Sequence, residues 1–179
     1  MEKLFFSFLI FSGCRRGEAS ALTWNDLDFE RRSVKISKTV NRHGLNKGQY
    51  EFTSPKNRYS VREIILPDNL LQLLADYKHE CEHIDGFSEN AFVFGIYKPI
   101  IENTMLTHFH KYTEALGLKR IRLHDLRHLH ASLLAYHGAS PMVVAARLGH
   151  SDIKQTLNTY SHFFPLEQQR AVEALNLAF

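Results

Sequence analysis

The chain has 179 residues, of which 44% are hydrophobic and 23% are charged, and these values are typical of a soluble globular protein with one hydrophobic core. Its formal net charge of +3 permits a nucleic-acid partner without indicating one, because the placement of the charges matters more than their sum. No apolar run approaches the ~20 residues that cross a bilayer, so we expect no membrane partner.

Two cysteines, Cys14 and Cys81, match no zinc or redox spacing, and we interpret them as free thiols in a reducing cytoplasm. The apolar stretch 4–11, followed by the small residues 19–21, has features of a signal peptide. Charged residues such as Arg15 lie between the two, where a signal peptide has neutral residues. We therefore expect a core helix and a cytoplasmic location. The immediate start of this helix suggests that the chain begins inside a larger protein.

Hydrophobic periodicity and turn residues predict the following elements in the first half of the chain. They are a buried helix over 2–12, a short helix over 16–22, a turn over 24–28, a strand around Phe29, a strand over 33–38 and a polar loop over 41–49. Residues 50–53 and 60–66 are expected to form a hairpin joined by residues 54–58. Pro67 then opens a helix that runs to about Cys81.

The second half is predicted to be mostly helical. A short apolar segment over 91–94 precedes helices over 104–116, 124–136, 141–148, 153–159 and 166–177. The expected fold class is α+β, with a small antiparallel sheet near the N-terminal third and helices around and after it. We expect one catalytic domain over residues 1–179.

Six residues fit the task of holding a phosphodiester while a tyrosine attacks it. They are Arg15, Lys56, His124, Arg127, His150 and Tyr160. A phosphate in a displacement reaction spreads negative charge over its non-bridging oxygens, and fixed cationic donors stabilise that charge. Arginine, histidine and lysine side chains supply such donors. They are also expected to lower the pKa of the tyrosine, which is otherwise near 10.

Each candidate also has a structural interpretation. Glu18, three residues after Arg15, is expected to orient that arginine or the turn. His128 and His130 are interpreted as buried, hydrogen-bonded helix residues. No His-Glu-x-x-His pattern or carboxylate at ligand spacing accompanies the histidines, so we expect no metal site.

The tyrosines differ in the setting that the sequence gives them. Tyr112 and Tyr136 lie on amphipathic helices and are interpreted as core residues. Tyr160 ends a short helix in a polar segment, which suits a side chain that must reach a substrate. It is therefore the candidate nucleophile.

Four segments that contain the six residues resemble the C-terminal catalytic domain of tyrosine recombinases, the phage integrase family, especially integrases of phages and conjugative transposons of Gram-positive bacteria. They are residues 12–28 with Arg15, 54–67 with Lys56, 123–132 with His124 and Arg127, and 148–162 with His150 and Tyr160. The segments occur in the family's order and at its spacing, over roughly residues 10 to 165. Asn57 departs from the pattern, since the family more often has threonine or a small residue there.

The resemblance implies a site-specific recombinase for the integration or excision of a mobile element. Tyr160 would form a 3′-phosphotyrosyl bond, and Lys56 would give a proton to the 5′-hydroxyl that leaves. The partner would be double-stranded DNA, with no metal, ATP, cofactor or small-molecule substrate. Four protomers would act together and exchange the helix over 166–177. The family's N-terminal DNA-binding domains would be absent from this chain.

Three other functions remain open from the sequence. A type IB topoisomerase uses the same chemistry to relax supercoils and acts as a monomer. A DNA-binding module without catalysis would carry the segments with a decayed site. A metal-dependent nuclease built on the histidines would lose its activity in EDTA.

Overall fold

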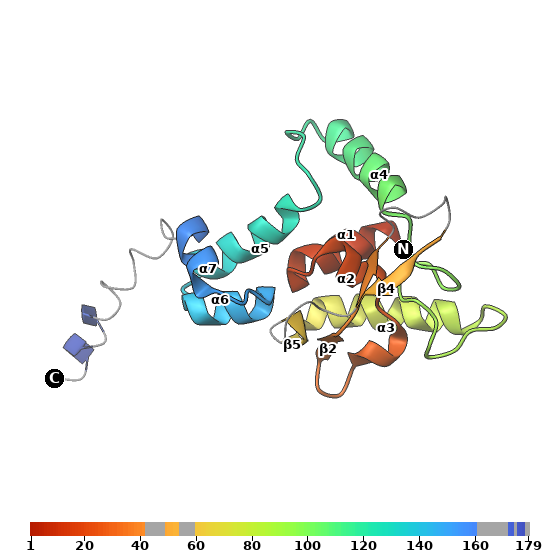
Figure 1. The fold of residues 1–179 in the computed structure, drawn as a ribbon, viewed down its shortest axis with the longest axis horizontal. Helices are drawn as coiled ribbons and strands as arrows, with labels where there is room; N and C mark the ends of the chain where they lie inside the picture. Colours follow the sequence, from red (N-terminus) through yellow and green to blue (C-terminus); the bar gives the residue numbers. More distant parts are fainter. Residues whose placement is uncertain (42–48, 54–59, 161–171, 174, 178–179) are drawn as a thin grey trace.

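A small antiparallel sheet lies in the N-terminal part of the protein (Figure 1). The computed structural model describes residues 1–41, 49–53, 60–160, 172–173 and 175–177. The sheet contains β1 (Leu27–Asp28), β2 (Ser33–Ile36) and β5 (Arg62–Ile65), in the order β1-β2-β5. Val34 of β2 is paired with Leu27 and Ile64. With the helices described below, this sheet confirms the predicted α+β class.

The predicted hairpin was wrong. Residues 50–53 and 60–66 do not form a hairpin: β4 (Glu51–Thr53) pairs with β3 (Thr39–Asn41) in a separate ribbon, and β5 pairs with β2. The strand predicted around Phe29 is present slightly earlier, as β1, and Phe29 itself lies in the turn between β1 and β2. The hairpin error concerns pairing between strands, which short-range alternation does not determine.

The N-terminal helix is buried, as its sequence predicts. α1 (Glu2–Ser12) has apolar side chains on every face, and such a helix is stable only inside a core. Phe5 and Phe8 are fully buried and contact the ring of Phe94. α3 (Asp68–Glu82) covers α1 and contributes Leu70 and Leu74 to the same core. α2 (Arg16–Ser20) follows α1 directly.

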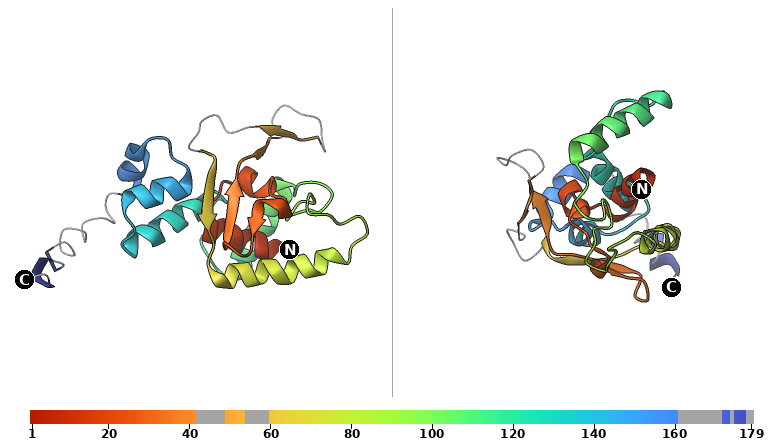
Figure 2. Two further views of the ribbon diagram at one scale, coloured as in Figure 1. Left: turned by 90° about the horizontal axis from the view of Figure 1, so that it is seen from below. Right: turned by 90° about the vertical axis from the view of Figure 1, so that its right-hand side faces the viewer.

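The remaining helices form a second group at one end of the protein (Figure 2). This group contains α5 (Asp125–Tyr136), α6 (Pro141–Leu148) and α7 (Ile153–Tyr160). The other helix, α4 (Glu102–Ala115), does not belong to it and packs near the start of the chain. α5 packs on α1 and thereby joins this group to the N-terminal part. Ser140 caps α6 and Gly149 ends it in the left-handed conformation (φ 69°). These helices confirm four predictions, while the predicted helix over 166–177 lies largely outside the described residues.

His130 of α5 connects the N-terminal part to the second group of helices. Its Nδ1–H donates to the carbonyl of Ile10 at 2.8 Å, and its Nε2 accepts from Nε of Arg147 at 3.4 Å. Both nitrogens are thus used by the neutral ring. Burial, followed by the charge of Arg147, lowers the pKa of His130 to about 4. The close approach also requires Gly13, where a Cβ atom would lie 2.5 Å from the His130 ring.

This histidine predicts that the protein loses stability in mild acid. An unfolded histidine titrates near 6.5 and His130 near 4, so the unfolded state binds more protons between these values. The free energy of unfolding should therefore fall as the pH is lowered from about 6.5 to about 4, by about 3 kcal/mol for this one group. Urea unfolding at a series of pH values measures it.

A matched pair of variants isolates the contribution of His130. His130→Asn retains a donor for Ile10 but cannot titrate, so its unfolding free energy should depend less on pH. His137→Asn, at an exposed position just after the same helix, should retain the full pH dependence. An unchanged pH dependence in His130→Asn would contradict the assignment.

Candidate active site

Arg15 is held by a carboxylate at the start of α2. Glu18 accepts hydrogen bonds from the Arg15 backbone N–H at 2.8 Å and from its guanidinium at 2.9 Å, which confirms the orienting role expected for Glu18. On its other side, Glu18 accepts from Nη2 of Arg62 at 2.8 Å. Burial raises the pKa of Glu18, but the hydrogen bonds and charges of Arg62 and Arg15 lower it by more than burial raises it. The pKa of Glu18 is therefore below its ordinary value. Glu18 is therefore an ionised carboxylate between two guanidinium groups.

Arg62 is a residue of this site that sequence reasoning missed. Its side chain is 6% exposed and also donates from Nε to the backbone carbonyl of Arg147 at 2.6 Å. A signal for it exists in the alternation of β5, where Arg62 and the buried Ile64 share one face. A cation on the inward face of a strand predicts a buried anionic partner.

Removal of Glu18 should destabilise the protein strongly. Glu18→Ala leaves the Arg62 cation buried beside Arg15 without its counter-charge, and such losses typically cost about 3–5 kcal/mol. Glu89→Ala is the control, because the Lys78–Glu89 pair lies at the surface, with Glu89 48% exposed, and should cost at most about 1 kcal/mol. Urea unfolding of both variants measures the difference. Equal losses would show that the Glu18 pair behaves as an ordinary surface pair.

Arg127 connects two helix ends. It lies on α5, is 4% exposed, and donates from Nη1 to the carbonyl of Gly13 at 2.8 Å and from Nη2 to that of Leu148 at 2.6 Å. Gly13 ends α1 just before Arg15, and Leu148 ends α6 just before His150. A cation is favourable at such C-terminal carbonyls. Burial, followed by the charge of Arg15, lowers the pKa of Arg127 to about 10, so it remains a cation at neutral pH.

The two carbonyl bonds leave Arg127 with donors to spare. A guanidinium carries five N–H groups in a fixed plane, and the framework uses one on each terminal nitrogen. The remaining three can donate to a phosphate oxygen. Arg127 therefore holds the framework with two of its five N–H groups and is itself almost fully enclosed.

His124 and Arg15 line a common pocket of about 580 Å³, together with Arg16 and Arg122. His124 is the residue before α5. Partial burial, then the charges of His128 and Arg127, lower its pKa. Three of its lining residues are arginines, and carboxylates bond to two of them, Glu18 to Arg15 and Asp125 to Arg122.

His150 follows the Gly149 cap of α6, and its Nδ1 lies 2.8 Å from Oγ1 of Thr156. Burial, then the charges of Arg127 and Arg15, lower the pKa of His150 to about 4. The expectation that both histidines are cationic donors is therefore corrected: His124 and His150 are shifted towards the neutral form. Each neutral imidazole still offers one N–H donor.

Tyr160 occupies a different setting from the one predicted. It is 3% exposed and packs with Val144 and Leu148 at the end of α7. Its hydroxyl lies 2.7 Å from Nδ1 of His128. Burial raises the pKa of Tyr160, and Arg127 only partly opposes this, so the expected lowering of its pKa is also corrected. His128 is thus a contact of the candidate nucleophile, a role that its interpretation as a structural histidine missed.

The predicted burial of Tyr112 and Tyr136 was also wrong. Tyr112 and Tyr136 were expected in the core but are 42% and 61% exposed. The buried face of α7 is formed by Thr156 and Tyr160, which are four residues apart. This spacing is the sequence signal that could have predicted the burial of Tyr160.

Five of the six predicted residues act on one another electrostatically. The charges of Arg15 and Arg127 both reach His124 and His150, and Arg127 also reaches Tyr160. These side chains come from the segments that precede α2, α5 and α7, from α5 itself and from the end of α7. Lys56 lies outside the described residues.

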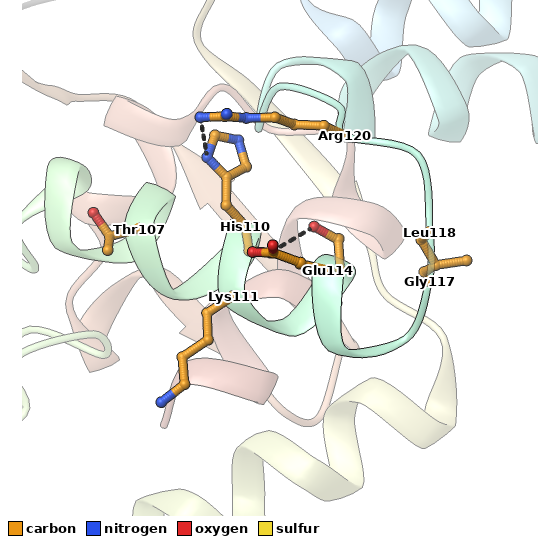
Figure 3. A pocket seen from close by; sticks show the side chains of 8 residues that line it. Thr107, His110, Lys111, Glu114, Gly117, Leu118 and Arg120 are labelled. Atoms are coloured by element: carbon orange, nitrogen blue, oxygen red, sulfur yellow. Dashed lines mark hydrogen bonds between the residues drawn. The ribbon is translucent and has the colours of Figure 1, made fainter.

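A second pocket, of about 730 Å³, lies beside the C-terminal half of α4 (Figure 3). Nη2 of Arg120 reaches Nδ1 of His110 at 3.1 Å across it, and Lys111 adds a further positive charge. None of the six predicted residues lines this pocket. His110 also lines the pocket of Arg15, so the two basic hollows are neighbours.

Two further observations concern only the part of the chain that the structure describes. No group of three or more His, Cys, Asp or Glu side chains there is arranged to hold a metal ion. No helix in these residues has the length and apolar character needed to traverse a bilayer.

Comparison with known proteins decides the family. The sequence pattern of the phage integrase family matches residues 1–166. The chain belongs to the phage integrase family. This confirms the resemblance to tyrosine recombinases.

Individual relatives of this integrase-family chain agree with that assignment. The ICEBs1 integrase of Bacillus subtilis is 29% identical over 97% of this chain and 48% of its own length. The transposase of transposon Tn916 from Enterococcus faecalis is 30% identical over 86% of this chain and 40% of its own length. The chain thus spans about half or less of the curated relatives it matches.

Solved structures share its fold. The Tn1549 transposon integrase in complex with transposon right end DNA superimposes with a TM-score of 0.75, at 28% identity, over 97% of this integrase-family chain and 58% of that chain. The XerA recombinase has a TM-score of 0.66 at 16% identity over 89% of this chain and 57% of that chain. The latter likeness concerns the fold alone.

Proposed function

We propose that this chain is the catalytic domain of a site-specific DNA recombinase that integrates or excises a mobile element. The observation that carries the proposal is the double anchor of Arg127, which ties the segment before Arg15 to the segment before His150. The names of the relatives, integrases and a transposase, support a mobile element. The DNA complex of the Tn1549 integrase supports double-stranded DNA as the partner.

In the proposed reaction, the hydroxyl oxygen of Tyr160 attacks the scissile phosphorus. The Tyr160 O–P bond forms, the P–O5′ bond breaks, and a 3′-phosphotyrosyl intermediate results. Arg15 and Arg127 donate to the non-bridging oxygens, where charge increases in the transition state. His124 and His150 add neutral N–H donors, and Lys56 gives a proton to the departing 5′-oxygen. The covalent bond retains the energy of the phosphodiester, so the rejoining step needs no ATP.

Assembly into a tetramer with exchange of the C-terminal segment is part of the proposal. Large apolar side chains are exposed on α5 and at the start of α6: Leu129, Leu133, Met142 and Val143. Leu129 and Leu133 are four residues apart and share one helix face. Near the end of the chain, Val172, Leu175 and Leu177 are also exposed. These two apolar sets support a contact in which the segment of one protomer covers α5 of its neighbour.

A nicked suicide DNA substrate tests the proposal. Its short 5′ fragment diffuses away after cleavage, so a recombinase should accumulate as a covalent protein–DNA adduct, with or without EDTA. A two-site plasmid should then yield recombinant products. No adduct, or an adduct that EDTA abolishes, would contradict the proposed chemistry. Relaxation of supercoils without joining of two duplexes would contradict recombination.

A further inference from the structure

We propose that His128 accepts the phenolic proton of Tyr160 during strand cleavage and holds the hydroxyl beforehand. This inference rests on the proposed role of Tyr160 as the nucleophile. It assigns a catalytic residue that lies on α5 directly after Arg127 and four residues after His124.

The contact between the two side chains is direct. Nδ1 of His128 and the hydroxyl of Tyr160 are 2.7 Å apart, and the ring centroids are 6.1 Å apart. A phenol with its proton is the donor in this pair, so the Nδ1 lone pair accepts and the proton of neutral His128 sits on Nε2. This is the geometry that a general base requires before it removes a proton.

Burial makes such an acceptor necessary. Tyr160 is almost fully enclosed, and its pKa is raised, so few molecules hold a phenolate at neutral pH. Other nearby groups are less suited to take the proton. Arg127 is a donor only, and His150 already uses Nδ1 towards Thr156.

The surroundings of His128 can accommodate the extra charge. His128 is half-buried, and the ring of His124 meets it edge-on at a centroid distance of 5.0 Å. The charges of His128 and His150 repel each other, whereas Asp125 attracts the charge of His128. Asp125 is an acid whose negative charge favours imidazolium, and the bound phosphodiester would add a second negative charge.

The step balances in atoms and electrons. The Tyr160 O–P bond forms as the phenolic proton moves to Nδ1 of His128, and the P–O5′ bond breaks as the 5′-oxygen takes a proton from Lys56. In rejoining, the 5′-hydroxyl attacks phosphorus and gives its proton back to Lys56, the Tyr160 O–P bond breaks, and His128 returns the proton to the phenolate. His128 therefore acts as base in one direction and acid in the other.

His128→Asn separates proton transfer from positioning. The asparagine carbonyl lies near the place of Nδ1 and can accept the hydroxyl, but it cannot take the proton. Single-turnover cleavage of the suicide substrate should fall by about 10²- to 10⁴-fold, with DNA affinity unchanged. His137→Asn, the same change at an exposed site just beyond α5, should cleave normally. If His128→Asn does not fold, His128→Gln replaces it, with thermal unfolding as the check.

A substrate with sulfur in place of the bridging 5′-oxygen identifies the end of the reaction at which His128 acts. A thiolate leaves without a proton, because thiols have a pKa near 8.5. Cleavage by Lys56→Ala should recover on this substrate, whereas the defect of His128→Asn should persist. Recovery of His128→Asn would place it at the leaving group and overturn the inference. Cleavage of ordinary DNA by His128→Asn at the wild-type rate or faster would show that the contact between His128 and Tyr160 has no part in proton transfer, and would also overturn the inference. The proposed function is tested separately with Tyr160→Phe: covalent protein–DNA adducts formed by that variant would contradict the role of Tyr160 as nucleophile.

Discussion

Tyr160→Phe should abolish covalent adducts on a suicide substrate while DNA binding survives. The change removes only the hydroxyl that attacks phosphorus, whereas affinity for DNA arises mainly from cationic contacts with phosphates. The ring should retain its packing against Val144 and Leu148. Loss of the bond to His128 should reduce stability by about 1 kcal/mol. Denaturing gels measure the adduct, and a filter-binding assay measures affinity.

Tyr136→Phe is the matched control for this experiment. Tyr136 lies at the end of α5, is 61% exposed, and belongs to none of the proposed contacts with DNA. It should form adducts at the wild-type rate. Adduct formation by Tyr160→Phe would remove this tyrosine as nucleophile, whatever the behaviour of the control.

Arg15→Ala and Arg127→Ala should each lower strand cleavage by at least ~100-fold, as expected when one donor to a developing negative charge is lost. Their effects on stability should differ. Arg127→Ala leaves the carbonyls of Gly13 and Leu148 without their buried donor, at a cost of about 1–3 kcal/mol each. Arg15 has a side chain that is 41% exposed, and its removal leaves Glu18 still bonded to Arg62.

Two measurements on the same preparations distinguish the roles of these arginines. Single-turnover cleavage reports catalysis, and urea unfolding reports the framework. We expect both variants to be deficient in cleavage and only Arg127→Ala to be strongly destabilised. Near-normal cleavage by either variant, or an equal loss of stability in both, would contradict the roles assigned from the structure.

Local sequence signals predicted the helices well, for physical reasons that act over a few residues. Gly13 and Gly149 end helices because they adopt the left-handed conformation without steric cost. Pro141 begins α6, where its missing N–H has no intrahelical partner. Strand pairing depends instead on residues far apart in the chain. Nothing local in β5 indicates that it pairs with β2 and not with β4.

In the candidate site too, local patterns predicted residues, whereas their surroundings depend on packing between distant segments. The family pattern predicted Arg15, Arg127 and Tyr160 as site residues, but not what surrounds them. The environment of Tyr160 depends on how α7 packs against α5 and α6, and that packing set its burial, its bond to His128 and its raised pKa. A pattern of residue types carries no information about such enclosure.

Arg127 makes the assembly of this centre cooperative. A single guanidinium donates to the carbonyls at two helix ends, Gly13 and Leu148, which are 135 positions apart in the chain. Fraying of one helix end therefore removes a restraint from the other. Local loosening therefore disperses several reactive groups together instead of leaving a partly competent set. Under the proposed function, strand cleavage would therefore be lost as a whole once the scaffold begins to open.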